Sequence, residues 1–385
     1  MRDRIIYAGY LIRCPLGGYA WQVLHYLAGL RALGFDVYFY EDTRHVEEAF
    51  DPERGLSDVA YEYGCGFASR FFARFGFADR WVFHDVRRDR FAGLDRDATE
   101  TLFREARILV NAGGVHRFTP EQRRGKSNVF IDMDPGFTQL RLAGGDAKLA
   151  ELVREHDRLF TYGENIGTER CAIPAGPFDW RPTRQPVALE HWPVACPGGD
   201  DAFTTIGRWD SGGRDVEVEG QLYTWRKRTE WQKLMRLPSE SGARFEIAMD
   251  VHDALDRAQL TANGWQVRDP VELSRDPDRY RAFIGGSAGE ITTAKDVNIR
   301  LRSGWFSDRS ACYLASGRPV VTQDTAFADV LPTGAGLFSF RTLADAAAAI
   351  AAIRAEPDHH SRAARRIAEE HFAAERVLSA LVAEL

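Results

Sequence analysis

The sequence predicts an α/β protein made of two Rossmann-like domains, and three observations support that fold class. Short apolar runs, typical of buried strands, alternate with stretches of helical periodicity in both halves of the chain. Glycine or polar residues follow several of these runs, as in loops at the carboxyl ends of parallel strands. Six prolines interrupt the periodicity between residues 173 and 200, and 385 residues are enough for two domains of roughly 100–200 residues each.

The first half opens as a strand, a glycine-containing loop, a helix and a second strand. Within the expected helix at 19–33, Trp21, Leu24, Leu27 and Leu30 recur at helical spacing, and a glycine ends it. The same alternation continues along the chain. We expect strands at 5–9, 36–40, 107–111, 128–132 and 158–162, with helices at 19–33, 59–75 and 147–155.

The second half repeats the alternation and ends in helices. We expect strands at 202–209, 244–249, 265–267, 280–284, 319–322 and 336–340, with helices at 226–236, 306–316, 344–352 and 360–384. These patterns divide the chain into a first domain at 1–172, a connection at 173–200, a second domain at 201–360 and a final helix at 361–385.

Composition and charge argue against several classes of protein. A net charge of −6 argues against broad nucleic-acid binding, which depends on clustered lysine and arginine. The five cysteines form no Cys-x-x-Cys pair, so neither a disulfide framework nor a zinc site is indicated. No apolar run approaches the roughly 20 residues that span a bilayer, and the N-terminus lacks a signal-peptide core. We therefore expect a cytoplasmic protein with no integral membrane segment and no nucleic-acid partner.

The stretch 302–325 carries the strongest functional pattern. A polar loop leads into a helix, a glycine and a proline end that helix, and a short apolar strand follows. The free N–H groups and the dipole of a helix start favour a phosphate group. Ser307 and Ser310 add hydroxyl donors, and Arg302 and Arg309 add positive charge on either flank. The pattern therefore predicts an anion site at this helix start.

The run Gly304-Trp305-Phe306-Ser307, the later turn Gly317-Arg318-Pro319-Val320-Val321 and the polar Gln323-Asp324-Thr325 resemble the donor-binding segment of GT-B nucleotide-sugar glycosyltransferases of the group 1 or CgeB-like type. The resemblance covers mainly residues 200–340, with a weaker echo at 1–40. It implies two Rossmann-like domains that face a central cleft, with a C-terminal helix crossing back to the first domain. It also implies transfer of a sugar from a nucleoside diphosphate-sugar, held by the second domain, to an acceptor held by the first.

The resemblance assigns the donor diphosphate to basic residues of the second domain. Arg208 stands after the first strand of that domain, where related enzymes place a diphosphate-binding arginine, and Lys295 precedes the donor helix. Each is either a ligand or a solvated surface charge, and together they form the leading pair. Glu290, expected in a flexible loop at 285–290, is either a ribose ligand or solvated. The remaining donor-side candidates are Arg302, Gly304, Ser307, Asp308, Arg309, Ser310, Gln323, Asp324 and Thr325.

Two departures from the family pattern bear on the chemistry. Gly17, Gly18 and Tyr19 correspond to the loop that borders the acceptor, but Tyr19 stands about where some families carry a histidine base. Many retaining members carry two glutamates separated by seven residues, and Gly304 and Cys312 stand in their places here. The resemblance therefore assigns no base at this loop, and we expect inversion of the anomeric centre.

Three residues after predicted strands of the first half are candidates for the base. Asp132, Asp134 and His116 stand where a carboxylate or imidazole could take the proton of an acceptor hydroxyl. We hypothesise Asp132 or Asp134, although Asp134 before a proline is equally typical of a turn and a lone histidine is more often structural. Asp132 and Asp134 have the spacing of an acidic metal motif, but they lie in the acceptor half. We therefore expect no metal and no cofactor besides the sugar nucleotide.

Two other functions fit the same sequence. A sugar-nucleotide epimerase needs a donor site and acid–base groups but no acceptor pocket. A non-catalytic nucleotide-sugar-binding protein needs the donor site alone. Product analysis with and without acceptors separates the first alternative from a transferase, and slow hydrolysis of the donor separates the second.

Overall fold

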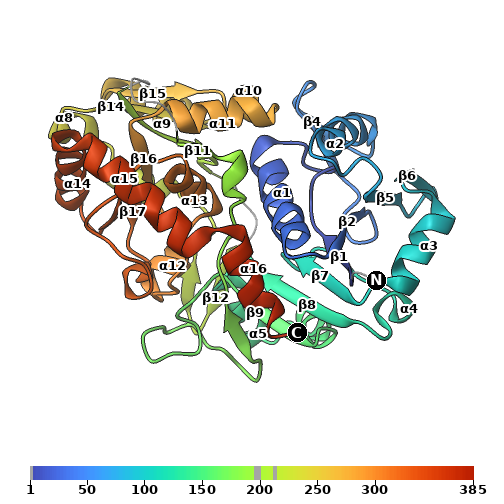
Figure 1. Cartoon of the computed structure of the whole chain (residues 1–385). Coiled ribbons are helices and arrows are strands. Elements are labelled where there is room, and N and C mark those ends of the chain that lie inside the picture. Colours follow the sequence, from blue (N-terminus) through green and yellow to red (C-terminus); the bar gives the residue numbers. More distant parts are fainter. Residues whose placement is uncertain (1–2, 195–200, 211–214) are drawn as a thin grey trace.

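The computed structural model describes residues 3–194, 201–210 and 215–385, which form two α/β lobes (Figure 1). The first lobe contains a sheet of eight strands in the order β10-β9-β8-β7-β1-β2-β5-β6, and only β6 runs antiparallel to its neighbour. The strands are β1 (Arg4–Ala8), β2 (Asp36–Asp42), β5 (Trp81–Asp85), β6 (Arg90–Gly93), β7 (Ile108–Ala112), β8 (Ser127–Asp132), β9 (Arg158–Thr161) and β10 (Trp180–Pro182).

Helices cover this sheet, so its central strands are buried almost throughout, as is usual for parallel sheets. A small antiparallel hairpin, β3 (Ala49–Asp51) and β4 (Leu56–Asp58), follows β2. The helices are α1 (Gly17–Ala32), α2 (Glu62–Arg74), α3 (Arg96–Glu105), α4 (Pro120–Arg123), α5 (Phe137–Ala143) and α6 (Ala147–Arg154).

The second lobe contains six parallel strands in the order β15-β14-β11-β16-β17-β18. They are β11 (Ala202–Gly207), β14 (Arg244–Met249), β15 (Trp265–Arg268), β16 (Gly289–Thr292), β17 (Val320–Gln323) and β18 (Leu337–Phe340). The helices are α7 (Arg228–Lys233), α8 (Leu237–Ser241), α9 (Ala254–Ala262), α10 (Pro270–Ser274), α11 (Pro277–Gly286), α12 (Asp296–Arg300), α13 (Asp308–Ala315), α14 (Leu343–Ala355), α15 (Pro357–Ile367) and α16 (Ala374–Val382).

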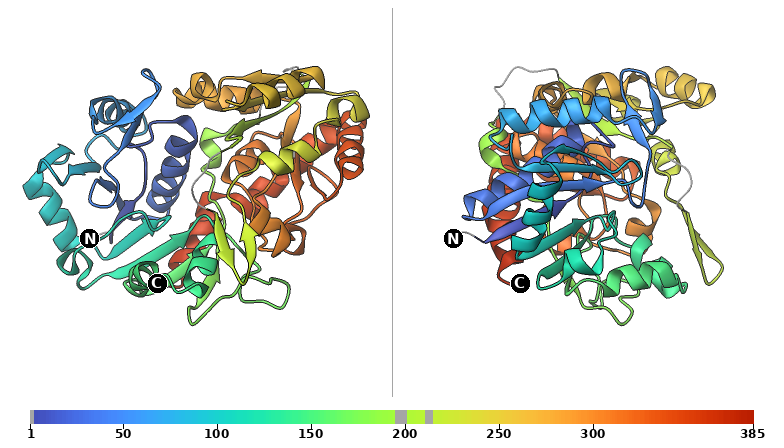
Figure 2. Two further views of the ribbon diagram at one scale, coloured as in Figure 1. Left: turned by 180° about the vertical axis from the view of Figure 1, so that it is seen from behind. Right: turned by 90° about the vertical axis from the view of Figure 1, so that its right-hand side faces the viewer.

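A hairpin of β12 (Val216–Val218) and β13 (Gln221–Tyr223) is inserted after β11 and projects from the second lobe (Figure 2). Its Tyr223 packs with Phe137 and Leu140 of α5, which belongs to the first lobe, and with Val297 of α12. The insertion therefore contacts both lobes.

The predicted fold class of two parallel α/β halves is confirmed, and so is the return of the last helix to the first lobe. α16 lies against α1 so closely that a Cβ atom on Gly29 would stand 2.6 Å from Leu378 Cδ1. Arg158 Nε of β9 also donates to the carbonyl of Glu384, at 2.8 Å. The stretch 173–200 contains β10 of the first sheet, and its residues 195–200 lie outside the described chain. The domain limits themselves stay predictions.

The strand predicted at 280–284 is wrong, because these residues lie in α11. Asp276 caps this helix by accepting from the N–H groups of Asp278 and Arg279, and a proline occupies its first turn. Tyr280 and Ile284, four residues apart, form its buried face. The strand of this region is β16, so Glu290 lies in the sheet and not in a flexible loop.

The two lobes share one apolar core along α1. The buried cluster that contains Tyr7 and Trp21 of the first lobe also contains Phe306 and Tyr313 of the second. Figure 1 shows α1 on the side of the first lobe that faces the second. The seam between the lobes is therefore a packed interface, and the candidate site is built along it.

Candidate functional site

The loops that follow the strands of the two sheets meet at the seam between the lobes. Lys295 Nζ, just before α12, lies 2.6 Å from Asp134 Oδ1, just after β8. Trp21 Nε1 of α1 donates to the carbonyl of Pro277 at 2.8 Å, on the second lobe. In parallel sheets, ligands bind beyond the carboxyl ends of the strands, so this seam is where chemistry is expected.

Arg309, in the first turn of α13, ties that helix to the second sheet. Its guanidinium donates to the carbonyl of Ile206 at the end of β11 (2.7 Å), to Thr292 Oγ1 at the end of β16 (2.7 Å) and to Glu290 Oε1 (2.5 Å). Glu290 is fully buried, so its charge neutralises Arg309 and does not face a ribose in this structure. Arg309 thus fixes the position of the helix start, and its N–H groups are largely committed.

Lys227, at the N-cap of α7, is the cation that the sequence analysis missed. Its ammonium group donates to the carbonyl of Thr293 at 2.8 Å and lies 5.4 Å from the centre of the Trp305 ring. Burial, followed by the positive charges of Arg309 and Lys295, lowers the pKa of Lys227 to about 7. The positive charges of Lys227, Arg309 and Lys295 are therefore close enough to repel one another. An anion bound between them would reduce this repulsion.

Arg208 follows β11 and points its charge toward the first lobe. The side chain is exposed, and among the residues the structure describes it has no hydrogen-bond or ion-pair partner. Burial raises the pKa of Cys14 to about 11, and the Arg208 charge acts in the opposite direction on that thiol. Burial likewise raises the pKa of Tyr19, and Arg208 again acts to lower it. Arg208 is therefore near the loop after β1, across the seam from its own lobe.

The predicted pair Arg208 and Lys295 thus lies at the seam, with Lys227 between the sheet edge and the Trp305 ring. Lys295 Nζ also lies 3.1 Å from the centre of the Trp225 ring, which in turn is 4.6 Å from the Phe137 ring of the first lobe. We call Arg208, Lys227 and Lys295 the seam cations. Together they could neutralise a diphosphate, because oxyanions are stabilised by fixed cations in a partly desolvated site.

The three candidates for the base occupy different surroundings. Asp132 is buried and accepts hydrogen bonds from Thr138 Oγ1 (2.8 Å), Gln139 Nε2 (2.8 Å) and Thr161 Oγ1 (3.0 Å). Burial raises the pKa of Asp132 to about 6. Asp134, by contrast, has a side chain that is 49% exposed at the seam. Asp132 therefore holds the loop after β8 in shape, and Asp134 is the carboxylate that this loop presents.

His116 lies inside the first lobe and not at the seam. It is fully buried, with Nε2 3.1 Å from the carbonyl of Gly9 and Nδ1 3.4 Å from Asp42 Oδ1. Both ring nitrogens are thus engaged where the loop after β1 begins. The structure gives His116 the place of a residue that positions this loop.

The polar residues after β17 are also engaged within the second lobe. Asp324 accepts from the N–H of Ala326 (2.7 Å) and from Arg341 Nε (2.6 Å). Thr325 Oγ1 donates to the carbonyl of Trp305 at 2.6 Å. Gln323 Nε2 donates to Glu230 Oε2 at 2.6 Å. The Thr325 bond holds the loop before α13, and all three side chains are hydrogen-bonded within the second lobe in this structure.

Two of the predicted glycines, Gly304 and Gly17, lie at close contacts between the lobes. Gly304 has φ +77°, and a Cβ atom there would lie 2.9 Å from the Asn165 side chain of the first lobe. At Gly17 a Cβ atom would lie 2.6 Å from Tyr280 Cβ of α11, whereas at Gly18 the nearest Tyr280 atom is 3.6 Å away. Arg302 is exposed and turned toward Asp329, 3.9 Å away, so it does not join the seam cations.

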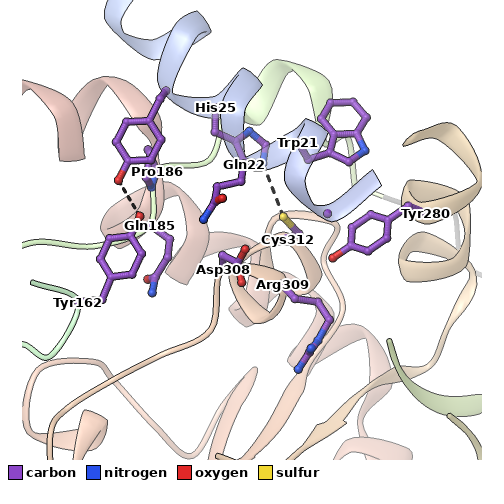
Figure 3. A pocket seen from close by; sticks show the side chains of 12 residues that line it. Trp21, Gln22, His25, Tyr162, Gln185, Pro186, Tyr280, Asp308, Arg309 and Cys312 are labelled. Atoms are coloured by element: carbon purple, nitrogen blue, oxygen red, sulfur yellow. Dashed lines mark hydrogen bonds between the residues drawn. The ribbon is translucent and has the colours of Figure 1, made fainter. Parts of the chain in front are cut away.

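The start of α13 is covered by α1 (Figure 3). Between them lies a cavity of about 10 Å³, which is the room that one water molecule needs. Asp308 projects into this cavity, and Ser310 Oγ is buried without a hydrogen-bond partner among the described residues. The predicted phosphate position at this helix start is therefore closed here, and Asp308 places a negative charge beside it.

Two buried pairs line the same cavity, one within the first lobe and one between the lobes. The hydroxyl groups of Tyr26 and Tyr162 are 2.6 Å apart, and Cys312 Sγ lies 3.6 Å from His25 Nε2. Because the backbone N–H of Ala188 donates to His25 Nδ1, the proton of the neutral ring is on Nε2 and points to the sulfur. Burial lowers the pKa of His25 to about 3, so this ring stays neutral. The pair packs the seam and carries no charge.

The described part of the chain contains neither a metal-binding cluster nor a membrane-spanning helix. No group of three or more histidine, cysteine, aspartate or glutamate side chains gathers there in a geometry that could hold a metal ion. No helix among those residues combines the length and the apolar character that a membrane span requires.

Comparisons with known proteins identify the fold. No protein-family model matches the sequence, and no curated protein matches it.

Solved structures do match over nearly the whole chain. An alpha-glucosyltransferase in complex with UDP and a DNA 13-mer gives a TM-score of 0.60 at 10% identity, covering 99% of this chain and 98% of that one. Sucrose-phosphate synthase from Thermosynechococcus elongatus gives 0.58 at 12% identity, covering 100% and 99%. Anabaena HepE in complex with UDP and glucose gives 0.55 at 10% identity, covering 100% of both chains. These neighbours are GT-B glycosyltransferases, so the chain has the GT-B fold.

Proposed function

We propose that this protein is a glycosyltransferase that moves a sugar from a nucleoside diphosphate-sugar to a hydroxyl or amine of a small-molecule or glycan acceptor in the cytoplasm. The observation that carries the proposal is the gathering of Arg208, Lys227 and Lys295 at the seam. UDP in two of the structural neighbours supports the same class of ligand. The seam cations hold the diphosphate of the donor.

In this proposal the seam cations also do the work that a metal ion does in other transferases. The leaving diphosphate gains negative charge in the transition state, and fixed cations stabilise that charge. Arg208 offers a planar fork of N–H donors for phosphate oxygens, and Lys227 and Lys295 add point charges. Transfer therefore needs no metal, and an excess of EDTA should leave the rate unchanged.

Asp134 is the base of the proposed reaction. Lys295 is drawn to the donor diphosphate and releases the Asp134 carboxylate, which then accepts the proton of the acceptor hydroxyl. The acceptor oxygen forms a bond to the anomeric carbon as the bond from that carbon to the phosphate oxygen breaks, and the nucleoside diphosphate leaves with the electron pair. Attack opposite the leaving group inverts the anomeric centre. Asp134→Asn should lower turnover by about 100-fold or more, within the usual range for a lost general base.

A panel of sugar nucleotides tests the donor part of the proposal. The melting temperature of the protein is measured with UDP-, GDP-, ADP- and TDP-sugars, since a ligand that binds only the folded state raises it. One nucleotide should raise the melting temperature of the wild type and of the control Lys148→Ala, an exposed lysine of α6. The same nucleotide should have no effect on Arg208→Ala/Lys227→Ala. A protein indifferent to every sugar nucleotide would contradict the proposal.

Product analysis then separates transfer from the two other functions. The wild type with a bound donor should consume it slowly by hydrolysis, and faster when a suitable acceptor is present. An epimerised sugar nucleotide without an acceptor would identify an epimerase. Binding without any turnover of the donor would identify a binding protein.

A further inference from the structure

A second site lies in the first lobe, away from the water-sized cavity beside α13. A hollow of about 440 Å³ opens between β4, the start of α2 and the β5–β6 hairpin, elements that are labelled in Figure 1. Sites for small molecules typically measure about 300–1,000 Å³. The hollow is therefore large enough for a ligand of that class.

The hollow and the seam both lie at the carboxyl ends of the strands of the first sheet. β2 separates β5 from β1, and two strand spacings amount to about 10 Å. The loop after β1 stands between the hollow and the seam, because Glu41 at the end of β2 accepts from the N–H groups of Leu11 (2.8 Å) and Ile12 (2.7 Å). A ligand that extends about 10 Å from the hollow therefore reaches the loop after β1. Asp134 follows β8, four strand spacings from β5, so an acceptor that also reaches Asp134 must extend about 20 Å.

Part of the lining is apolar. The rings of Tyr61 and Phe83 pack with their centres 4.9 Å apart. The Tyr61 hydroxyl already donates to the carbonyl of Glu47 at 2.6 Å, so this side chain offers the hollow its ring and not its hydroxyl. Val59 in the lining and Leu56 nearby in β4 are each 39% exposed. Val59 therefore adds an exposed apolar surface to the lining.

Two carboxylates of the lining are already paired. Asp85 Oδ2 lies 2.9 Å from Arg88 Nη1, and the N–H of Arg88 also donates to Asp85. Asp58 Oδ2 lies 2.8 Å from Arg54 Nη1, and Asp58 Oδ1 accepts from the N–H of Ala60. The charges of these two acids are therefore balanced within the protein.

Two other charged residues of the lining have no hydrogen-bond or ion-pair partner among the described residues. Arg90 stands directly opposite Asp85 in the β5–β6 register, so its side chain is on the face that carries Phe83 and Asp85. Glu62 stands at the start of α2, on the other side of the hollow. The hollow therefore offers one uncommitted cation and one uncommitted carboxylate beside an apolar wall.

We propose that this hollow binds the body of the acceptor, a small molecule with a flat apolar part and an anionic group that pairs with Arg90. Val59 and the Tyr61 ring contact the flat part, and the buried Phe83 ring supports Tyr61. Glu62 accepts a hydrogen bond from a hydroxyl or amine of the molecule and disfavours a second anion. The role of this molecule as the acceptor rests on the proposed function, whereas its binding to the hollow does not require a donor.

An aromatic sulfonate tests the proposal because it has this chemistry. 8-Anilinonaphthalene-1-sulfonate is titrated into the folded full-length protein, and its fluorescence reports binding. N-Phenyl-1-naphthylamine has the same rings without the anion and serves as the neutral probe. Arg90→Glu should raise the Kd of the sulfonate by about tenfold or more and that of the neutral probe by less than about twofold. Val59→Trp, which narrows the hollow, should weaken both probes.

Arg87→Glu is the matched control, since it makes the same charge change three residues earlier, in the turn that leads into β6. Arg87 is largely exposed, pairs with Glu47 at 3.4 Å and does not line the hollow, so this variant should bind both probes as the wild type does. Unchanged melting temperatures show that the variants are folded. A sulfonate Kd that is the same in wild type and Arg90→Glu would overturn the proposal, and so would insensitivity of both probes to Val59→Trp.

The same variants separate this proposal from the proposed function. Each is also titrated with the UDP-, GDP-, ADP- and TDP-sugars of the panel, and whichever nucleotide binds the wild type should bind Arg90→Glu and Arg87→Glu equally. If sulfonate binding depends on Arg90 but the protein binds no nucleotide, the proposal for the hollow is supported and the glycosyltransferase function is contradicted. If the protein binds a nucleotide but sulfonate binding does not depend on Arg90, the glycosyltransferase function is supported and the proposal for the hollow is contradicted.

Discussion

At the scale of single residues, Lys227 links the charge of the site to its pH dependence. With a pKa of about 7, this lysine is protonated in only about half of the molecules at neutral pH. A bound diphosphate favours the protonated form and raises the pKa of Lys227. Donor binding above pH 7 must therefore take up a proton, and affinity should fall as the pH rises, by at most about tenfold per pH unit.

Calorimetric titration between about pH 6 and pH 9 with the nucleotide that raises the melting temperature measures this dependence. Lys227→Arg keeps its charge throughout this range, so its affinity should fall much less. Proton uptake is read from the dependence of the binding enthalpy on the buffer. A wild-type affinity that is constant across the range, or one that changes equally in both proteins, would contradict this role of Lys227.

Asp132 makes a second pH prediction, which concerns stability. Burial raises its pKa from 3.8 to about 6, so the folded protein binds this proton more tightly than the unfolded chain does. The stability that protonation contributes is therefore full below about pH 4 and is lost as the pH rises through about 6. The two-unit shift corresponds to about 3 kcal/mol.

Asp132→Asn should remove this pH dependence, because the amide does not titrate. The free energy of unfolding in urea, measured at several pH values for wild type and variant, should shift by about 3 kcal/mol in favour of the variant between pH 4 and pH 7. Asp134→Asn is the control, since its half-exposed carboxylate lies two residues away. Parallel curves for wild type and Asp132→Asn would show that Asp132 does not titrate in this way.

The sequence could name candidates at this scale but could not rank them. Arg208 and Lys295 were predicted from their places after strands and before a helix. Lys227 was missed because its distinction is a contact with the carbonyl of Thr293, far away in the chain. Asp132 and Asp134 were left as alternatives, since only the folded chain shows which of them is buried. The burial of a charge is a property of tertiary packing and leaves little trace in local sequence.

At the scale of elements, the contact of α1 with α11 depends on one glycine. A Cβ atom at Gly17 would lie 2.6 Å from Tyr280 Cβ and 3.2 Å from the carbonyl of Ser274, so neighbouring atoms must move. At Gly18 the nearest contact is an ordinary 3.6 Å. Alanine at either position gains helix propensity of about 0.5–1 kcal/mol over glycine. The steric cost therefore separates two otherwise similar substitutions.

Gly17→Ala should lower the free energy of unfolding by about 1–3 kcal/mol, the usual cost of overpacking. Gly18→Ala should be neutral or stabilising by less than about 1 kcal/mol. Urea unfolding of the two variants beside the wild type provides the comparison. Equal stability of the two variants would mean that α1 and α11 do not meet as described.

Elements whose apolar spacing fits only one kind of secondary structure were predictable from sequence. Elements whose spacing fits both a helix and a strand were not. α1 was predicted because its apolar positions fit only a helix and its neighbours are clear strands. The apolar spacing around Tyr280 and Ile284 fits a short strand as well as a helix, and the cap at Asp276 decides for the helix. Once α11 is a helix, the strand that follows must be β16, which moves Glu290 from a loop into the sheet.

At the scale of the whole molecule, the two lobes should unfold together. They share the apolar cluster along α1, and Lys295 with Asp134 and Trp21 with Pro277 connect them at the seam. Far-ultraviolet circular dichroism and tryptophan fluorescence should therefore report one coincident thermal transition. Two separated transitions would show that the seam contributes little to stability.

The sequence predicted the two α/β halves, because each half repeats a recognisable alternation of elements, and the resemblance to GT-B enzymes implied the return of the final helix. It did not predict how closely the halves meet. The covered start of α13, the His25–Cys312 pair and the contact at Gly304 arise between residues distant in the chain, so no local pattern records them. A phosphate at the start of α13 would therefore require the lobes to move apart, whereas Arg208 is exposed as the protein stands.

The measurement that tests the central claim most directly is a calorimetric titration of wild type, Lys148→Ala and Arg208→Ala/Lys227→Ala with the sugar nucleotide that raises the wild-type melting temperature, at one pH and salt concentration. The first two proteins should bind that nucleotide with the same affinity, and the double variant should bind it at least about 100-fold more weakly, a loss of about 2.7 kcal/mol. Equal affinity in all three proteins would contradict the claim that the seam cations hold the diphosphate.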